Sequence, residues 1–410
     1  MKTLASIRKS IDEIDKEILT FVKLHKKTKK TNIDQVKKFS GPFRYVLEEL
    51  STCCTISPLL EEKLIKRRAL VTQAGECKEK KKISSFRLMR EFEILYSATQ
   101  FASKNSLPVA NLYRVFREII SSSLAHELKL ANRQLRFLYL GPEGSYSHLA
   151  TQLFIGRSIP QEPIASVEVL IQAVLKDDNA FAVLPIENST SGYIFNHSDL
   201  VVKPLKILGE ILLPIHHHLL SRAKKLSNIK TIYAHEQSLL QCSAWLKRAI
   251  PGATIVPCAS NSKAAELVAR SRAQTVGAIA SFGAAQHYQI PILASNIQDF
   301  ANNTTRFVVI GHAQDDWSSK HLPFKSSLVV LLPHVPGSLH SFIKKLKSTN
   351  ITRIDSRPNP QRPFQYHFYI DFECKKPNID IHQKVINKIS KHVIRNYGSY
   401  PVAVLRPSDL

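Results

Sequence analysis

The segment from Leu184 to Leu200, LPIENSTSGYIFNHSDL, places an acid and an amide directly after an apolar run. Glu187 and Asn188 are then followed by a small, hydroxyl-rich turn that begins at Ser189. Carboxylate, amide and hydroxyl groups can together orient a small polar substrate through hydrogen bonds. The same pattern also fits a strand over residues 181–186 that leaves a sheet through a polar loop. The rest of the chain has to decide between these two interpretations.

Two other turns could contribute to the same cleft. GPEGSYSHLA (residues 141–150) follows an apolar strand and opens a helix, so Ser145 and Ser147 can cap that helix or bind an oxyanion at its positive end. In CASNSKAAEL (residues 258–267), Asn261 or Ser262 would cap a second helix. Together with the Glu187–Asn188 loop, these helix starts predict a cleft for a small carboxylate, with simple capping as the alternative.

The elements that must position these residues fall into three regions. Residues 1–132 carry apolar side chains at steps of three and four, which predicts helices only. From residue 135 to about 311, short apolar strands alternate with helices, which predicts an α/β architecture with a largely parallel sheet. After a polar joint, residues 321–410 follow a β-α-β-β-α order, which predicts a small α+β domain.

Length and composition limit the number of domains and the class of protein. A chain of 410 residues is long enough for two to four domains, and its 44% hydrophobic and 22% charged residues indicate a globular protein. It has no uncharged apolar run of about 18 residues and no apolar stretch at its N-terminus, so we expect neither a membrane span nor a secretory signal. The six cysteines show no metal-binding or redox spacing, which favours reduced thiols in a cytoplasmic protein without a metal.

The net charge of +24 raises the possibility of a nucleic-acid partner. However, the basic residues are spread along the whole chain, without a zinc-finger or RNP signature and without interleaved aromatic residues. A generally basic surface or a small polyanionic substrate explains the charge equally well. We therefore expect no nucleic-acid partner.

Six segments of the middle region form a specific pattern when they are taken together. GPEGSYS, LPIENSTSGYIFNHSDL, LLPIHHHLL, YAHEQSLLQC, SNSKAAELVA and NIQDFANNTTRF resemble prephenate dehydratase in order and in spacing, over residues 135–311. The resemblance implies two α/β lobes of the kind found in periplasmic binding proteins, with no metal or organic cofactor. It also implies the decarboxylating dehydration of prephenate to phenylpyruvate in phenylalanine biosynthesis. Departures are mild; for example, Ser145 and Tyr146 stand where Thr and Phe are usual.

The resemblance assigns roles to individual residues. Thr305 would donate a hydrogen bond to the leaving hydroxyl group, and Arg306 would orient a carboxylate or support the site. Glu187 and His217 would be polar supports, although a structural role for His217 is equally compatible with the sequence. The other pocket residues that the resemblance implies are Asn188, Ser189, Ser145, Ser147, Gln241, Ser262 and Phe307.

The helical region resembles the chorismate mutase that is often fused ahead of this dehydratase. The resemblance rests on LASIRKSIDEIDKEIL, KRRALVTQAGECK, RLMREFEIL and LYRVFREIISSSLAHE. Chorismate rearranges without covalent help, so the site needs a clamp of cations for two carboxylates and a developing charge on the ether oxygen. The matching residues are Arg8, Arg67, Lys78 and Arg90 as cations, Glu91 as acceptor of the substrate hydroxyl and Glu127 beside the ether oxygen. The alternative is a basic, solvated helical bundle.

One departure weakens the mutase assignment. Arg8 and Arg67 are 59 residues apart, whereas the family carries both arginines on one uninterrupted helix. The insertion, at about residues 26–58, contains the helix breaker Gly41–Pro42. Either the first helix bends through the insertion, or Arg8 no longer reaches the site. A monofunctional dehydratase whose helical arm only dimerises is therefore an alternative.

The C-terminal region resembles the ferredoxin-like ACT regulatory domain, on SSLVVLLPHVPGSLHSFIKKL and ITRIDSRP. The phenylalanine-binding motifs of that family correspond to Gly337-Ser338-Leu339 and Asp355-Ser356-Arg357-Pro358, with Ser338 in place of Ala and Asp355 in place of Glu. The resemblance implies L-phenylalanine as effector and a homodimer or higher homo-oligomer. A non-catalytic, amino-acid-sensing binding protein is the remaining alternative, because two-lobed clefts and ACT domains both suit solute sensing.

Overall fold

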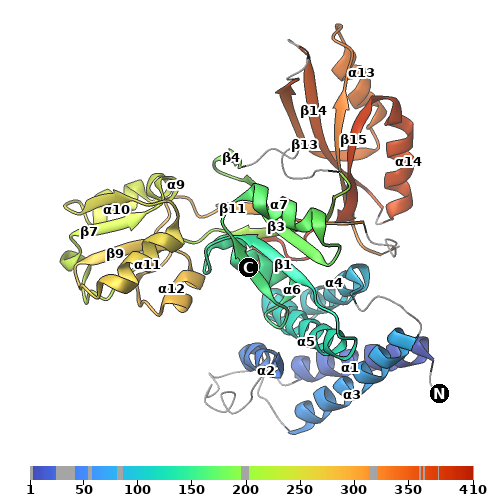
Figure 1. The fold of residues 1–410 in the computed structure, drawn as a ribbon, viewed down its shortest axis with the longest axis horizontal. Helices are drawn as coiled ribbons and strands as arrows, with labels where there is room; N and C mark the ends of the chain where they lie inside the picture. Colours follow the sequence, from blue (N-terminus) through green and yellow to red (C-terminus); the bar gives the residue numbers. More distant parts are fainter. Residues whose placement is uncertain are drawn as a thin grey trace.

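The computed structural model describes residues 3–24, 42–53, 58–80, 86–194, 203–313, 319, 321–359, 362, 365–376 and 378–409. Much of the predicted insertion at about 26–58 lies outside these residues. Figure 1 shows an N-terminal group of helices, a central α/β region of two lobes and a C-terminal region of one sheet with two helices. Within the described residues, no helix combines the length and the apolar character that crossing a membrane requires.

The N-terminal region is entirely helical, as predicted. Its helices are α1 (Leu4–Leu24), α2 (Pro42–Cys53), α3 (Pro58–Lys80), α4 (Leu88–Lys104) and α5 (Val109–Leu130). The apolar spacing of α1 buries Leu4, Ile7 and Ile14 on one face, and this face packs along α3. Helices α2 and α4 pack against α5, which is the central helix of the group.

The first lobe of the central region is a mixed sheet with the strand order β2-β1-β3-β11-β5, and β4 pairs with β3 at its end. Its elements are β1 (Arg136–Leu140), α6 (Tyr146–Ile155), β2 (Gln161–Ile164), α7 (Val167–Lys176), β3 (Ala180–Asn188), β4 (Gly192–Tyr193), β5 (Lys206–Pro214) and β11 (Thr304–Gly311). Strand β1 runs parallel to β2 and β3, whereas β11 runs antiparallel to both β3 and β5.

The second lobe is a separate mixed sheet with the order β10-β6-β9-β7-β8. Its elements are β6 (His218–Leu220), η2 (Leu226–Asn228), β7 (Thr231–Ala234), α9 (Glu236–Gln241), α10 (Ser243–Ala249), β8 (Thr254–Pro257), α11 (Asn261–Ser271), β9 (Val276–Ala280), α12 (Phe282–Tyr288) and β10 (Ile292–Ala294). The expectation of a largely parallel sheet is therefore wrong in detail. The chain leaves the first lobe after β5, builds the second lobe and returns as β11, which enters the first sheet antiparallel.

The C-terminal region is a four-stranded antiparallel sheet with the order β13-β14-β12-β15. Its elements are β12 (Phe324–Leu331), α13 (Ser338–Lys345), β13 (Thr349–Pro358), β14 (Tyr366–Cys374), α14 (Ile379–Ile389), η3 (Ser390–His392), β15 (Val393–Pro401) and η4 (Pro407–Asp409). The observed β-α-β-β-α-β order extends the predicted one by a final strand, and it is the ferredoxin-like arrangement that the sequence indicated.

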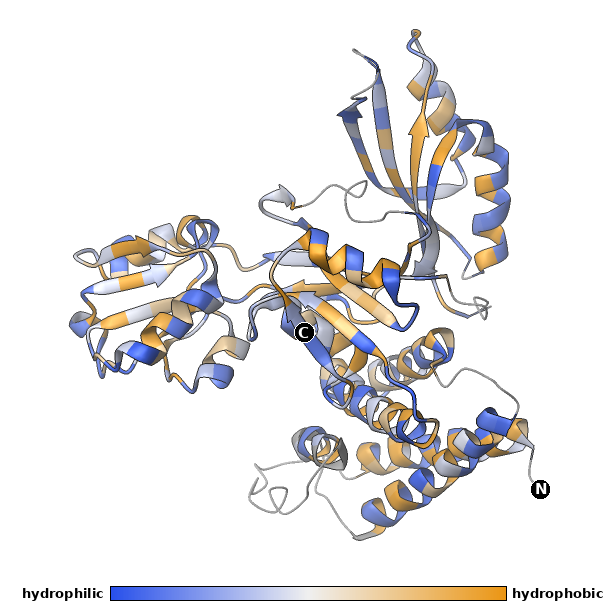
Figure 2. Cartoon of the chain, viewed as in Figure 1, coloured by the Kyte–Doolittle hydropathy of each residue, from blue (hydrophilic) through white to orange (hydrophobic). Residues whose placement is uncertain are grey.

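The first sheet has an apolar core on each face, and each core is shared with another region. On one face, Phe86 and Phe92 of the helical region contact Phe181 and Phe154, with ring centroids 5.1 and 5.8 Å apart. On the other face, α7 packs together with apolar residues of β12, β14 and β15. The ribbon in Figure 2 shows hydrophobic residues along β1, β3 and α7. The three regions are therefore joined by buried apolar surface as well as by the chain.

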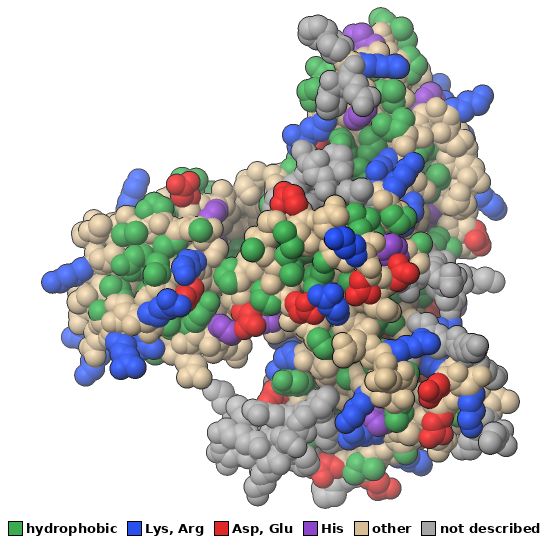
Figure 3. All heavy atoms as spheres, viewed as in Figure 1, with side chains coloured by type: hydrophobic (Ala, Val, Ile, Leu, Met, Phe, Trp, Pro, Cys, Tyr) green, Lys and Arg blue, Asp and Glu red, His purple; other side chains and the backbone are tan. Residues whose placement is uncertain are grey.

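The surface is basic without a dominant basic patch on the face that Figure 3 presents. Lys and Arg side chains are scattered there over all three regions and alternate with Asp and Glu. This distribution differs from the single-sign stripe that typifies nucleic-acid binding proteins.

Candidate active sites

A cavity of about 510 Å³ lies between the two lobes, where the chain crosses from β5 to β6 and returns to β11. Residues from both lobes and from the crossing segments line it. Among them are eight of the residues predicted for the dehydratase site: Ser145, Ser147, Asn188, His217, Gln241, Ser262, Thr305 and Phe307. Sequence motifs that lie more than 150 residues apart thus meet in one cleft.

Three predicted residues do not line this cavity, namely Glu187, Ser189 and Arg306. Neighbouring residues of a strand point to opposite faces of its sheet. Asn188 pairs with Thr305 and Glu187 pairs with Arg306 across β3 and β11, so the first pair faces the cleft and the second pair faces away. The Ser189 hydroxyl instead bridges the strand ends, because it donates to the Asn302 carbonyl and accepts from the Thr304 N–H.

Arg306 connects the dehydratase sheet to the C-terminal region, which corrects its predicted role in the pocket. Its guanidinium donates to Glu210 at 2.8 Å, to Asp371 of β14 at 2.7 Å and to the Tyr400 hydroxyl of β15 at 2.8 Å. Lys325 also contacts both oxygens of Glu210 at 3.0 Å. Burial alone would raise the pKa of Glu210, but Lys325 and Arg306 hold this pKa below its usual value.

The Asn188 amide has a defined orientation. Its Oδ1 accepts from the backbone N–H groups of Thr190 and Ser191, at 3.0 and 3.1 Å, and from both of their hydroxyls. A backbone N–H can only donate, so the other end of the amide must be the NH₂ group. This group donates to Thr305 Oγ1 at 2.9 Å and to Asn303 Oδ1 at 2.7 Å. Since Thr305 Oγ1 already accepts from Asn188, its own proton remains available for a ligand in the cleft.

The donor and acceptor directions that the Asn188 amide sets continue along the hydrogen-bond network to His217. Asn303 Nδ2 donates to Gln241 Oε1 at 3.0 Å, and His217 Nε2 lies 2.8 Å from the same oxygen. An amide oxygen accepts only, so Nε2 must carry the proton of His217. Burial lowers the pKa of His217, which favours the neutral ring with a free lone pair on Nδ1. The Tyr146 hydroxyl, which donates to the His216 carbonyl at 2.7 Å, lies 3.0 Å from Nδ1.

Helix starts frame both sides of the cleft. Ser145 caps α6, since its hydroxyl accepts from the His148 N–H at 3.2 Å. Helix α11 is capped by Ser260, not by Asn261 or Ser262 as predicted. Ser262 lies in the first turn of α11, is 2% exposed and still lines the cavity. The positive ends of α6 and α11 therefore both face the cleft, as an anionic ligand requires.

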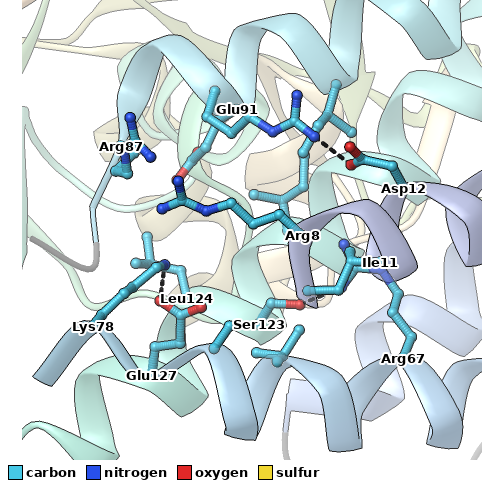
Figure 4. Close-up of a pocket in the computed structure, with 15 residues that line it drawn as sticks. Arg8, Ile11, Asp12, Arg67, Lys78, Arg87, Glu91, Ser123, Leu124 and Glu127 are labelled. Atoms are coloured by element: carbon cyan, nitrogen blue, oxygen red, sulfur yellow. Dashed lines mark hydrogen bonds and ion pairs between the residues drawn. The ribbon is translucent and has the colours of Figure 1, made fainter. Parts of the chain in front are cut away.

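A second pocket, of about 100 Å³, lies within the helical region. All six predicted chorismate-binding residues line it: Arg8, Arg67, Lys78, Arg90, Glu91 and Glu127. Figure 4 shows Arg8 reaching from α1 to a point between Glu91 on one side and Lys78 and Glu127 on the other. Arg8 thus reaches the site in spite of its distance from Arg67 in sequence, because α1 and α3 pack side by side.

The pocket has an excess of positive charge. Among the described residues, five cations and three acids line it, which suits a ligand with two negative charges. Several of these groups are paired with one another or with nearby acids. These pairs are Arg67 with Asp15 at 2.6 Å, Lys78 with Glu127 at 2.5 Å and Arg90 with Asp12. Ser123, which the sequence analysis did not single out, binds Arg67 at 2.6 Å.

Two pKa shifts describe this environment. Burial lowers the pKa of Arg8, and the like charges of Arg87 and Arg90 lower it further. Burial also raises the pKa of Glu127, although the ammonium group of Lys78 opposes the shift. A raised pKa keeps a larger fraction of Glu127 protonated near neutral pH, and only the protonated carboxyl group can donate a hydrogen bond.

The two predicted effector motifs lie at one end of the C-terminal sheet, where β12 and β13 both end. Leu331, at the end of β12, and Arg357, near the end of β13, both pair with His367 of β14. Gly337, with φ at +78°, caps α13 just beyond β12, and among the described residues no group outside its chain neighbours lies within 4 Å of the position where its Cβ would be. The predicted motif at residues 355–358 also lies close to a residue of the dehydratase cleft, because the guanidinium of Arg357 lies 5.5 Å from the centre of the Tyr193 ring, beside that of Arg353 at 4.1 Å.

Sequence reasoning missed three residues that organise the dehydratase cleft. Thr190, Asn303 and the Tyr146 hydroxyl belong to the hydrogen-bond network between Thr305 and His217. Asn303 is 2% exposed and immediately precedes the Thr-Thr-Arg-Phe segment, so its polar side chain at the start of an apolar strand was the available signal. Within the described residues, no group of three or more His, Cys, Asp or Glu side chains is arranged to hold a metal ion.

Comparisons with known proteins match the dehydratase part and the helical part of the chain to separate families. The prephenate dehydratase family matches residues 137–315, and the type II chorismate mutase family matches residues 59–128, a range that excludes Arg8. The bifunctional chorismate mutase/prephenate dehydratase of Neisseria gonorrhoeae is 34% identical over 78% of this chain and 87% of its own length. The protein of the same name from Aquifex aeolicus is 30% identical over 88% of this chain and 100% of its own length.

Solved structures give the same result for the dehydratase part. A prephenate dehydratase from Arthrobacter aurescens, in complex with L-Phe, matches with a TM-score of 0.58 and 26% identity, over 67% of this chain and 91% of that one. The prephenate dehydratase of Staphylococcus aureus matches with a TM-score of 0.56 and 26% identity, over 65% of this chain and 100% of that one.

Proposed function

The chain belongs to the bifunctional chorismate mutase/prephenate dehydratase family, and from this premise we propose which of its residues perform each reaction. The enzyme rearranges chorismate to prephenate and converts prephenate to phenylpyruvate, in the biosynthesis of L-phenylalanine. We assign the first reaction to the pocket of the helical region and the second to the cleft between the lobes.

In the dehydratase reaction, the ring of prephenate loses a carboxylate as carbon dioxide and a hydroxyl group as water. The electron pair of the breaking C–CO₂ bond passes into the ring as the hydroxyl group departs, and the departing oxygen takes up a proton. Thr305 is the donor to this oxygen. The observation that carries the proposal is the fixed amide of Asn188, which makes Thr305 Oγ1 an acceptor from the protein and thereby leaves its proton for the substrate.

The cleft also suits the retained pyruvyl carboxylate. The start of α6, with Ser145 and Ser147, and the start of α11, with Ser262, supply N–H and hydroxyl donors and the positive ends of two helix dipoles. His217 and Gln241 hold the network behind Thr305, and Phe307 gives the ring an apolar wall. Glu187, Ser189 and Arg306 support the strands from outside the cavity.

Replacing the proposed donor tests this assignment. Thr305→Ala should lower turnover of prephenate by roughly 100-fold or more, because the departing oxygen loses its hydrogen-bond donor in the transition state. Thr305→Ser, which keeps the hydroxyl group, should retain much more activity. Nearly normal turnover by a folded Thr305→Ala protein would refute the role of Thr305.

For the mutase reaction, we propose that Arg8, Arg67, Lys78 and Arg90 hold the two carboxylates of chorismate. Glu91 accepts from its hydroxyl group, and protonated Glu127 faces its ether oxygen. The excess positive charge and the raised pKa of Glu127 support this arrangement. A helical arm that serves only for dimerisation would have no need for a pocket of this composition.

We also propose that L-phenylalanine inhibits the enzyme from the C-terminal region. The candidate contacts are Gly337, Ser338 and Leu339 at the start of α13 and residues 355–358 at the end of β13. An inhibitor must bind a less active state more tightly than the active one. Tyr193 supplies a physical connection, since it touches Arg353 and Arg357 on one side and the cleft on the other. Dehydratase assays with rising phenylalanine test this proposal, and the absence of any response would refute it.

We further propose a cytoplasmic homo-oligomer. Cys242, Cys258 and Cys374 are free thiols, which fits a reducing compartment. The exposed edge at residues 337–339 and 355–358 is the surface through which we expect the C-terminal regions to pair. Light scattering of the purified protein measures the oligomeric state directly.

A further inference from the structure

Arg117 of α5 lies between the mutase pocket and the dehydratase region. Its side chain is 3% exposed. One nitrogen, Nη2, donates to Glu91 Oε2 at 2.7 Å, and the other, Nη1, donates to the backbone carbonyl of Phe154 at 2.9 Å. Glu91 lines the mutase pocket, whereas Phe154 lies near the end of α6, whose opposite end faces the dehydratase cleft. A single guanidinium therefore contacts both catalytic units.

Glu91 needs such a partner. Its side chain is 9% exposed, and a carboxylate this deeply buried is costly unless a cation and hydrogen bonds compensate it. Arg117 is its ion-pair partner among the described residues, and it occupies only Oε2. No described residue donates to Oε1, which leaves that oxygen to accept from a substrate hydroxyl. The other charged groups that line the pocket among the described residues are Arg8 and Asp12 of α1, Arg67 and Lys78 of α3, Arg87 and Arg90 at the start of α4, and Glu127 of α5.

We propose that Arg117 is a positioning residue for the rearrangement of chorismate, and that it makes the mutase pocket depend on α6 of the dehydratase region. This inference rests on the proposed mutase function of the helical pocket. Arg117 holds Oε2 of Glu91 and thereby leaves the other carboxylate oxygen, Oε1, for the substrate. The guanidinium is planar, so two partners on different elements fix its orientation, and α6 thereby determines where Glu91 is held.

The end of α6 is seated firmly enough to act in this way. Tyr113 donates to the Leu153 carbonyl at 2.9 Å, and the Ser158 N–H donates to Ser121 Oγ at 3.2 Å. Gly156 ends α6 with φ at +79°, and a Cβ at this position would lie 2.5 Å from Cβ of Ser121. A side chain there would have to push the end of α6 away from α5, and with it the carbonyl that holds Arg117.

The first experiment compares Arg117→Gln and Arg117→Lys in the full chain, with chorismate and prephenate as separate substrates. Arg117→Gln should lower kcat for chorismate by about 10- to 100-fold, the usual size for the loss of a hydrogen bond to a charged group. Because Arg117 positions the carboxylate that accepts from the substrate without lining the pocket itself, kcat should fall much more than KM changes. Arg117→Lys keeps a cation that can bind Glu91, so it should recover part of the lost kcat.

The comparison of kcat with KM separates positioning from a merely structural role. If Arg117 only stabilised the fold, both variants would unfold at lower temperature, but their folded fractions would keep the wild-type kcat and KM for chorismate. Turnover of prephenate reports on folding in the same samples. A wild-type kcat for chorismate in folded Arg117→Gln would overturn the proposal. If the wild-type protein itself showed no rearrangement of chorismate, the proposed mutase function would fail instead.

The second experiment perturbs the dehydratase side of the contact. Gly156→Ala should lower mutase turnover several-fold, although Gly156 is outside the mutase pocket, while the protein still converts prephenate. Gly252→Ala is the control, because nothing lies within 4 Å of its added Cβ. Equal mutase rates in Gly156→Ala and Gly252→Ala would refute the dependence on α6.

Discussion

Replacing Asn188 with an aspartate should reverse the hydrogen-bond polarity of the dehydratase cleft without changing its shape. The two backbone N–H groups of Thr190 and Ser191 would still hold one oxygen of the new carboxylate. The other oxygen would then face Thr305 Oγ1 at 2.9 Å and Asn303 Oδ1 at 2.7 Å, and it could only accept. Thr305 has one proton, and it would donate that proton to the new carboxylate instead of the substrate.

The size of the effect follows from what is lost. Removing one preorganised donor at a developing charge typically costs about 10²- to 10³-fold in kcat, so we expect a loss in that range for Asn188→Asp. Asn188→Ala should cost less, on the order of 10-fold, because it removes the amide that orients Thr305 but leaves the Thr305 proton available. The new negative charge near an anionic substrate should also raise KM, which is why kcat is the quantity to compare.

Steady-state assays of both variants across pH provide the test. At low pH the introduced carboxyl group becomes protonated and can donate again, so kcat of Asn188→Asp should recover as the pH falls, relative to the wild type. Asn188→Ala should show no such recovery. A kcat for Asn188→Asp equal to that of Asn188→Ala at neutral pH, without recovery in acid, would refute the assigned polarity.

Three further predictions concern the mutase pocket and the contact with the C-terminal region. Lys78→Ala should abolish most chorismate rearrangement and spare prephenate turnover, because a dianion would lose one of its buried cations; parallel assays of the two reactions check this. Because burial raises the pKa of Glu127 and the protonated form is the donor, mutase activity should fall as the pH rises through that pKa; Glu127→Gln should remove this decline from the measured pH profile. Arg306→Met should lower the free energy of unfolding, measured with denaturant, by about 3–5 kcal/mol, because Glu210 and Asp371 would stay buried without the positive charge of Arg306. A change within about 1 kcal/mol, the size of a surface substitution, would contradict that account.

The sequence predicted the cleft where local rules were sufficient. Ser145 and Ser147 follow a strand and open a helix, and Asn188 ends an apolar strand, so their place at strand ends follows from the order of elements. The error at Arg306 had a local remedy, because Thr305 and Arg306 are neighbours in a strand and cannot both face one cavity. Arg117 had no local signal, since its partners lie 26 and 37 residues away on other helices. Arg8 was uncertain because apolar spacing predicts a helix but not the helix beside which it packs.

The charged cluster of Arg306, Glu210, Asp371 and Lys325 limits how far the chain can be shortened without damage to the dehydratase region. A chain shortened to end before β12 would lose Lys325 and Asp371. Arg306 and Glu210 would then lie at a newly exposed surface, and Arg306 is the residue that follows Thr305 on β11. Loss of the proposed regulation in such a fragment would be inseparable from damage to the strand that carries the proposed catalytic hydroxyl. The C-terminal sheet thus covers one face of the dehydratase sheet and supports it, so variants insensitive to phenylalanine are better sought through single substitutions at residues 337–339 or 355–358 than through truncation.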